Sequence, residues 1–114
     1  DSNDHHYPQL AQLKTQLEAL TDLEGHPFEL LALPLPAAKH DKQGNRLPAS
    51  YANYLLINGA LLMPVYQDVA DDVAKAVLQK AHPAHEIIGI DCLPLIRQGG
   101  SLHCVTMQLP RGVL

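Results

Sequence analysis

The chain has 114 residues, a length that suits one domain with a single core. Hydrophobic residues make up 46% of it and charged residues 18%, which excludes a disordered tail. Eight Lys and Arg against twelve Asp and Glu give a net charge of −4 with no basic block, and the apolar runs are short, so we expect no nucleic acid and no membrane as partners.

Leucines at helical spacing predict a first helix, whose first turn holds Pro8 and which ends before Gly25. The apolar stripe consists of Leu10, Leu13, Leu17 and Leu20. The next apolar run, Phe28–Leu33, predicts a short strand, because a turn signal precedes it and prolines follow it. Residues 37–48 are polar and rich in turn-forming types, so they predict a solvated loop.

The clearest local signal is a β-hairpin. Its arms are Tyr51–Ile57 and Ala60–Val65. Between them stand Asn58 and Gly59, the pair that favours the positive φ angles of a type I′ turn. Both arms are apolar on both faces, so we expect them to be central and covered on both sides.

A second helix is predicted from about Asp68 to Ala81, because acidic residues crowd the first turn, where the helix dipole favours anions. Its inner face is expected to comprise Val69, Val73, Ala76 and Val77. The runs Glu86–Ile90 and His103–Leu109 predict a buried strand and the last strand of the chain.

A weak internal repeat links two segments of the chain. ELLALPLP at residues 29–36 and EIIGIDCLPL at residues 86–95 each follow a helix and run into a connection that contains proline. Each segment also precedes another predicted strand. The pattern favours repeated strand–strand–helix–strand units that need neighbours to bury their faces, although a chance likeness of two buried strands is the alternative.

The residues with chemical potential cluster at 98–108, in the sequence QGGSLHCVTMQ. Gly99 and Gly100 allow a tight turn or a close approach of the backbone to a ligand. Cys104 stands at the start of a predicted strand, and its thiol would need nearby positive charge, which a cationic substrate could supply, to react as the thiolate. A buried structural cysteine is the alternative. In a strand, His103 would point to the opposite face and is a poor candidate for the base.

Three sequence blocks occur together in this chain: PASYANYLLINGA at 48–60, IGIDC at 88–92 and GGSLHCVTMQ at 99–108. In this order they resemble the C-terminal part of the agmatine deiminase and bacterial peptidylarginine deiminase family. The resemblance runs from about Asp1 to Pro110. The last block alone would be weak, but the combination with the upstream Ala-Ser-Tyr-x-Asn block is specific.

The resemblance implies an α+β fold, the α/β propeller of the pentein type, with five ββαβ modules around a central active site. Residues 1–114 would then be the C-terminal part of one deiminase domain, roughly its last two modules, without the upstream modules. A start at Asp1 rather than Met, in a polar stretch, agrees with a piece of a longer protein. The resemblance also implies no cofactor, no metal and a cytoplasmic location.

Cys104 matches the family's nucleophile, which attacks a guanidinium carbon, expels ammonia and leaves a covalent thiouronium that water hydrolyses. The implied partner is a small guanidine such as agmatine, converted to N-carbamoylputrescine in putrescine biosynthesis, or an arginine side chain, converted to citrulline. Exposed sheet faces and edges would also invite a homo-oligomer.

The family's general-base histidine and its guanidinium-binding carboxylates match nothing in this chain. The isolated chain is therefore expected to be inactive. We expect solvated roles for His5, His6, His26, His40, His82 and His85. Arg97 and Gln98 depart from the residues that many relatives carry before the two glycines, and this departure bears on the substrate more than on the chemistry.

Asn53 and Gly100 are the expected substrate-binding residues. In the internal repeat, Asn53 occupies nearly the position of Cys104, which favours a hydrogen-bonding role at the site; a buried amide satisfied by the backbone is the alternative. Cys92 is expected in the core, without a disulfide to Cys104.

Two other functions remain open at this point. The first is a non-catalytic structural or binding module with a pentein-like fold. The second, weaker one is a thiol redox protein, because Cys92 and Cys104 lack the Cys-x-x-Cys spacing.

Overall fold

The computed structural model describes residues 2–113, and the chain divides at the Leu31–Ala32 junction into two compact units. The first unit contains α1 (Tyr7–Glu18), which confirms the helix predicted from the leucine spacing, with Pro8 in its first turn. None of the described residues of this unit is buried. The leucine stripe of α1 is therefore present, but it covers no core within its own unit.

A tight turn follows α1. The Asp22 carboxylate accepts a hydrogen bond of 2.9 Å from the backbone of His26, and Gly25 adopts a φ of +86°. The strand predicted at Phe28–Leu33 is wrong, since these residues form no strand. The physical reason is that a strand needs a partner, and the pairing described in this unit is a single bridge between Thr21 and Pro27.

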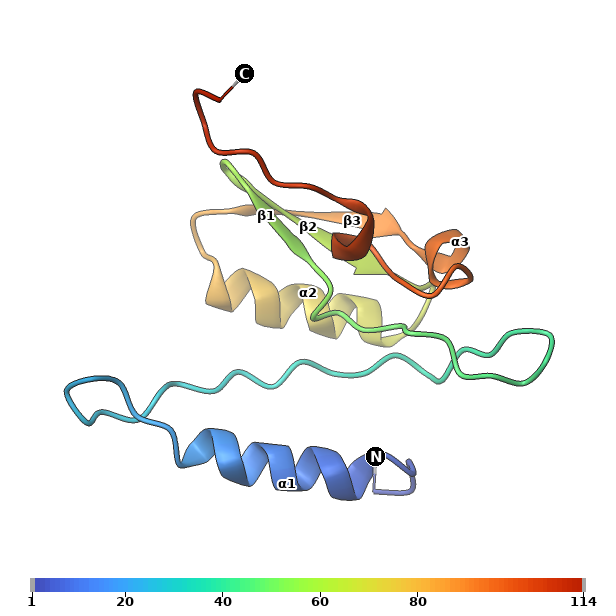
Figure 1. Cartoon of the computed structure of the whole chain (residues 1–114), viewed down its shortest axis with the longest axis horizontal. Helices are drawn as coiled ribbons and strands as arrows, with labels where there is room; N and C mark the ends of the chain where they lie inside the picture. Colours follow the sequence, from blue (N-terminus) through green and yellow to red (C-terminus); the bar gives the residue numbers. More distant parts are fainter. Residues whose placement is uncertain (1, 114) are drawn as a thin grey trace. The chain divides into compact units, whose positions relative to one another are not determined.

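The second unit is a three-stranded mixed sheet with a helix packed against one face (Figure 1). Its elements are β1 (Leu55–Ile57), β2 (Ala60–Val65), α2 (Ala70–Ala81), β3 (Glu86–Asp91), α3 (Leu93–Ile96) and the 3₁₀ helix η1 (His103–Val105). The strand order is β1-β2-β3, with β1 antiparallel and β3 parallel to β2. Helix α2 makes the crossover that the parallel pair requires, and the unit has the α+β character expected from the sequence.

The hairpin predicted around Asn58 and Gly59 is confirmed, with Ile57 opposite Ala60. The type I′ turn is wrong, because Gly59 has a φ of +82° while Asn58 is not among the described residues with positive φ. One positive φ at the second central position is the pattern of a type II turn, which likewise favours glycine there. The first arm is also shorter than predicted, because residues 51 and 52 form a turn and β1 begins at Leu55.

The core lies between one face of the sheet and α2. Leu61 and Met63 of β2 are fully buried, and Ala74 and Leu78 of α2 pack into the same cluster. The predicted inner face of α2 is wrong: Val69 and Val73 are exposed, Ala76 is exposed and Val77 is half-buried. Because valine and alanine occupy both sides of this helix, its apolar pattern did not identify the side that contacts the sheet.

Exposed apolar side chains remain on both faces of the sheet among the described residues. Leu56 lies on the same face as Leu61, while Ile57 and Ile88 lie on the opposite face; all three are exposed, so the prediction of strands covered on both faces is wrong for this chain. The buried strand predicted at Glu86–Ile90 is confirmed as β3, although it buries chiefly Ile87. No helix among residues 2–113 is long and apolar enough to cross a membrane.

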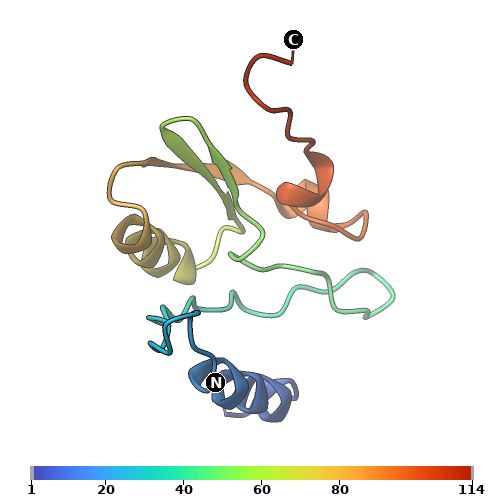
Figure 2. The ribbon, with the colours of Figure 1, turned by 60° about the vertical axis from the view of Figure 1, so that its left-hand side comes forward.

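The last predicted strand, His103–Leu109, is also wrong. Residues 103–105 form η1, and the residues after it adopt no regular structure as far as position 110. The backbone of His103 bonds to Asn53, outside the sheet, rather than to a neighbouring strand. Figure 2 shows α2 in gold beneath the sheet and the segment from α3 to η1, orange to red, at the end where β3 finishes.

Candidate active site

Cys104 lies in η1, at the end of a tight turn that begins with two glycines. Gly99 adopts a φ of +90°, a conformation that L side chains rarely adopt. A side chain on Gly100 would place its Cβ 2.9 Å from the Cβ and 3.4 Å from the Sγ of Cys104. The first glycine therefore allows the turn, and the second allows the backbone to pass directly behind the thiol, which is itself exposed.

Asn53 contacts both the thiol and the backbone that carries it. Its Nδ2 donates a hydrogen bond of 3.2 Å to the Sγ of Cys104, and its Oδ1 accepts one of 2.7 Å from the N–H of His103. The His103 N–H also lies 3.3 Å from the backbone oxygen of Asn53. The structure thus brings together Asn53, Gly100 and Cys104, the three residues that the sequence analysis places at the site. Asn53 and Cys104 are 51 positions apart in the chain.

These contacts favour the ionised thiol. Hydrogen bonds from the backbone of Ser101 and then from the Asn53 side chain lower the pKa of Cys104, against a weaker opposing effect of burial. The second cysteine is the opposite case: burial raises the pKa of Cys92, which is completely enclosed in the core as the sequence predicted. Both cysteines are free thiols.

A buried hydroxyl that the sequence analysis missed joins the two segments of the site. The Tyr66 hydroxyl donates a hydrogen bond of 3.0 Å to the carbonyl of Ser50 and accepts one of 3.1 Å from the Ser50 N–H. It also lies 2.8 Å from the Oγ of Ser101. Tyr66 and Ser101 are both buried, at 0% and 1% exposure. The sequence feature that could have indicated this link is a serine three positions before each site residue: Ser50 before Asn53 and Ser101 before Cys104.

A second tyrosine supports this network from behind. The Tyr51 hydroxyl donates a hydrogen bond of 2.7 Å to the carboxylate of Asp71, which also accepts one of 3.1 Å from the N–H of Tyr66. The rings of Tyr51 and Tyr66 lie 5.5 Å apart. Burial and the Asp71 carboxylate raise the pKa of Tyr51, so its hydroxyl keeps its proton and remains a donor.

The histidines do not surround this thiol. His103 is adjacent to Cys104, but its contribution in the described contacts is its backbone N–H; its imidazole is not among the groups bonded to the Sγ. His5, His6, His26 and His40 are exposed, as expected, while His82 and His85 are half-buried near the end of α2.

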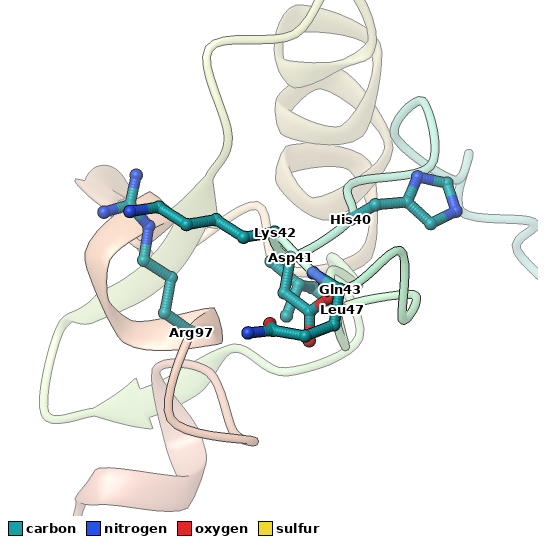
Figure 3. A pocket seen from close by; sticks show the side chains of 6 residues that line it. All are labelled: His40, Asp41, Lys42, Gln43, Leu47 and Arg97. Atoms are coloured by element: carbon teal, nitrogen blue, oxygen red, sulfur yellow. Dashed lines mark hydrogen bonds between the residues drawn. The ribbon is translucent and has the colours of Figure 1, made fainter.

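The described pocket lies elsewhere and shares no lining residue with the Cys104 site. It has a volume of about 290 Å³ and forms between the loop at residues 40–47 and Arg97 (Figure 3). Asp41 shapes this loop by accepting hydrogen bonds from the backbones of Gln43 and Asn45, which confirms the predicted polar loop. Figure 3 shows Lys42 and Arg97 reaching toward the same side of the pocket.

One group of side chains among the described residues has the spacing to hold a metal ion. It comprises Asp4, His5 and His6, whose ligand atoms lie within 4.8 Å of one another. Both histidines are exposed, and such exposed groups are common in proteins without a bound ion. The group lies in the first unit.

The fold and the exposed thiol define a candidate cysteine-dependent site, and comparison with known proteins identifies its family. Residues 1–110 match the model of the Porphyromonas-type peptidyl-arginine deiminases. The chain therefore belongs to this family. Its resemblance to agmatine and bacterial peptidylarginine deiminases, inferred above from three sequence blocks, is thereby confirmed.

Individual relatives agree with this assignment. A Marinomonas protein provisionally named an agmatine deiminase is 36% identical over 96% of this chain and 34% of its own length. A Porphyromonas gingivalis structure, provisionally named an arginine deiminase, has a TM-score of 0.93 and 49% identity over 98% of this chain and 33% of its own. A substrate-bound variant of the C. jejuni agmatine deiminase has a TM-score of 0.80 and 42% identity over 90% of this chain and 29% of its own.

The chain spans about a third of the length of the curated relatives that it matches. Two thirds of each of those proteins therefore have no counterpart among the residues described here.

Proposed function

We propose that this chain supplies the C-terminal part of a guanidine deiminase and that Cys104 is its nucleophile. The observation that carries the proposal is the environment of the Cys104 thiol, which is exposed and accepts a hydrogen bond of 3.2 Å from Asn53. Family membership supports the same reaction, because relatives over this segment are named as agmatine deiminases.

The proposed chemistry has two covalent stages. The Cys104 thiolate attacks the central carbon of the guanidinium, a carbon–sulfur bond forms, and one nitrogen leaves with an added proton as ammonia. Water then attacks the thiouronium carbon, the carbon–sulfur bond breaks, and the thiolate is regenerated with a ureido product. Asn53 holds the sulfur through its Nδ2, so the same amide orients the nucleophile at the start and receives the thiolate at the end.

The remaining groups come from outside this chain in our proposal. A histidine and carboxylates of the preceding modules would move protons and hold the guanidinium, within a five-bladed propeller whose last two modules include residues 1–114. Exposed Ile57 and Ile88 on one sheet face, and exposed Leu56 on the other, agree with a segment that has neighbours in a larger domain. The isolated chain then lacks the proton transfers and the substrate clamp, and it should be inactive.

Agmatine is the substrate that we propose, with N-carbamoylputrescine and ammonia as products. The support is the agmatine deiminase name of the Pseudomonas fluorescens and C. jejuni relatives. The family name also contains peptidyl-arginine, so an arginine side chain is the second candidate substrate. The pocket with Arg97 and Lys42 does not enter this proposal.

The test compares two cysteine variants of the complete protein that carries this chain. Cys104→Ser should lower ammonia release from agmatine by about a thousandfold or more, because a hydroxyl in this environment stays protonated. Cys92→Ser, at the buried thiol, should retain turnover within a few-fold. Full activity of the Cys104→Ser variant would refute the nucleophile and favour a non-catalytic role of this segment.

Substrate choice is measured on the same unmodified protein. Agmatine, free arginine and an arginine-containing peptide are compared through kcat/KM, with ammonia and the ureido product both quantified. We expect agmatine to be preferred. A preference for the peptide would keep the chemistry of Cys104 and replace the substrate.

A further inference from the structure

The Cys104 site is built from two chain segments that do not pair with each other in the sheet and do not belong to the same helix. Asn53 follows a turn at residues 51 and 52, ahead of β1, and Cys104 follows the glycine turn after α3. Neither segment belongs to the hydrogen-bonded sheet, so strand pairing does not fix their separation. The bonds between Asn53 and the His103 N–H join the segments next to the sulfur, and a second link holds them further from it.

The Tyr66 hydroxyl is bonded to both segments at once. It exchanges two hydrogen bonds with the backbone of Ser50, of 3.0 and 3.1 Å, three residues before Asn53. It also lies 2.8 Å from the side chain of Ser101, three residues before Cys104. Since the single Tyr66 proton goes to the Ser50 carbonyl, the Ser101 hydroxyl is the donor in the third bond.

Because the hydroxyls that make these hydrogen bonds are buried, removal of either one leaves its partner unpaired. Tyr66 is fully buried and Ser101 is 1% exposed, so water does not replace a missing partner easily. Tyr66 follows β2 directly, which anchors it to the central strand of the sheet. The Ser101 backbone also contributes the foremost hydrogen bond to the Cys104 sulfur. A movement of Ser101 would therefore displace the donor that bonds directly to the Cys104 sulfur.

From this geometry we infer that Tyr66 is a positioning residue for the nucleophile: its hydroxyl locks the Ser50–Asn53 segment to the Ser101–Cys104 segment. The inference rests on the proposed function of Cys104 and adds a residue that does not contact substrate. Tyr66 acts through Ser50, which stands three residues before Asn53, and through Ser101, whose backbone bonds to the sulfur.

The chain contains a matched control for this inference. Tyr51 is equally buried, its ring lies 5.5 Å from that of Tyr66, and its hydroxyl is also hydrogen-bonded, but to Asp71. Tyr51→Phe and Tyr66→Phe each remove one buried hydroxyl from the same cluster. Only the second removes the link between Ser50 and Ser101.

The experiment measures iodoacetamide alkylation of Cys104 across pH in the complete protein that carries this chain, with the site of modification resolved by mass spectrometry. Tyr66→Phe should slow alkylation at pH 7 by about three- to tenfold, the loss expected when one hydrogen bond to the thiolate is weakened. The rates should converge at high pH, where the thiol is fully ionised. Tyr51→Phe should change the neutral rate by less than about twofold, even where both variants lose similar stability.

A second variant covers the case in which Tyr66→Phe does not fold. Ser101→Ala removes the other end of the same bond and should reproduce the neutral slowing. Equal slowing in the Tyr51 and Tyr66 variants, or no slowing in the Tyr66 and Ser101 variants, would overturn the inference alone. Full turnover of the Cys104→Ser variant of the complete protein would instead overturn the proposed function, which separates the two failures.

Discussion

Two cysteines of this chain show opposite environments within one small unit. Cys92 follows β3, is completely buried, and has a raised pKa because of its burial. Cys104 is exposed in η1, and hydrogen bonds lower its pKa. The sequence separates them by only twelve positions.

The difference shows what converts a cysteine into a candidate nucleophile. Access alone would leave Cys104 an ordinary surface thiol. At Cys92, burial raises the pKa and outweighs the hydrogen bonds from Ser101 and Leu102 that lower it. At position 104 the chain supplies both exposure and directed donors, from Ser101 and Asn53. This arrangement requires a turn with almost no room for a side chain behind the thiol, because a Cβ added at Gly100 would lie 2.9 Å from the Cβ of Cys104.

Among the variants proposed here, Gly100→Val should most reduce the difference in reactivity between Cys104 and Cys92. A Cβ at this position would stand 2.9 Å from the Cβ of Cys104, so the turn must shift and both donors to the sulfur are disturbed. Alkylation of Cys104 at pH 7 should fall by about thirtyfold, the product of two weakened hydrogen bonds.

Gly99→Ala is the control for that variant. No atom lies within 4 Å of its added Cβ, but the φ of +90° is strained for alanine. It should cost about 1 kcal/mol of unfolding free energy, measured by urea denaturation, and leave the alkylation rate within about twofold. The interpretation of Gly100 would be wrong if both variants slowed alkylation equally.

A smaller effect is expected for Asn53→Asp. The carboxylate retains an acceptor for the His103 N–H but removes the Nδ2 donor and places negative charge beside the sulfur. Both changes raise the pKa of Cys104, so its alkylation at pH 7 should slow by about tenfold and recover at high pH. Asn53→Ala, without the added charge, should fall between the parent and the aspartate variant; unchanged rates in both would remove Asn53 from the site.

The smallest effect on Cys104 is expected from Cys92→Ala. The loss of a fully buried sulfur should lower the unfolding free energy by about 1–2 kcal/mol in urea denaturation, while the Cys104 alkylation rate stays unchanged. In the matched variant Cys104→Ala, stability should be unaffected, because the exposed side chain supports no core. A coupled response of the two positions would show that the contrast between them is not local.

Local sequence signals predicted the elements that depend on short-range chemistry. Helix α1, the polar loop, the hairpin and the burial of Cys92 follow from leucine spacing, turn residues and an apolar strand. The strands predicted at Phe28–Leu33 and His103–Leu109 do not form, because apolar composition does not supply a pairing partner. The inner side of α2 was missed for a related reason, since its apolar residues lie on both faces.

The candidate site likewise contains residues that the sequence predicted and one that it did not. The glycines, Asn53 and Cys104 were selected from a motif and a family resemblance, and the structure brings them into contact. Tyr66 was not selected, because its role depends on a bond to Ser101 across 35 positions that no local pattern reports. Long-range contacts of single side chains are the part that requires coordinates.

The most direct test of the account is the pH profile of alkylation for both thiols in the folded, unmodified protein that carries this chain. Iodoacetamide labelling, resolved to each cysteine by mass spectrometry, should give Cys104 a midpoint below the ordinary thiol value of 9.0. Cys92 should stay protected at the same pH until the chain is unfolded with urea. A Cys104 midpoint at or above the ordinary value, or equal labelling of the two thiols at neutral pH, would contradict the account.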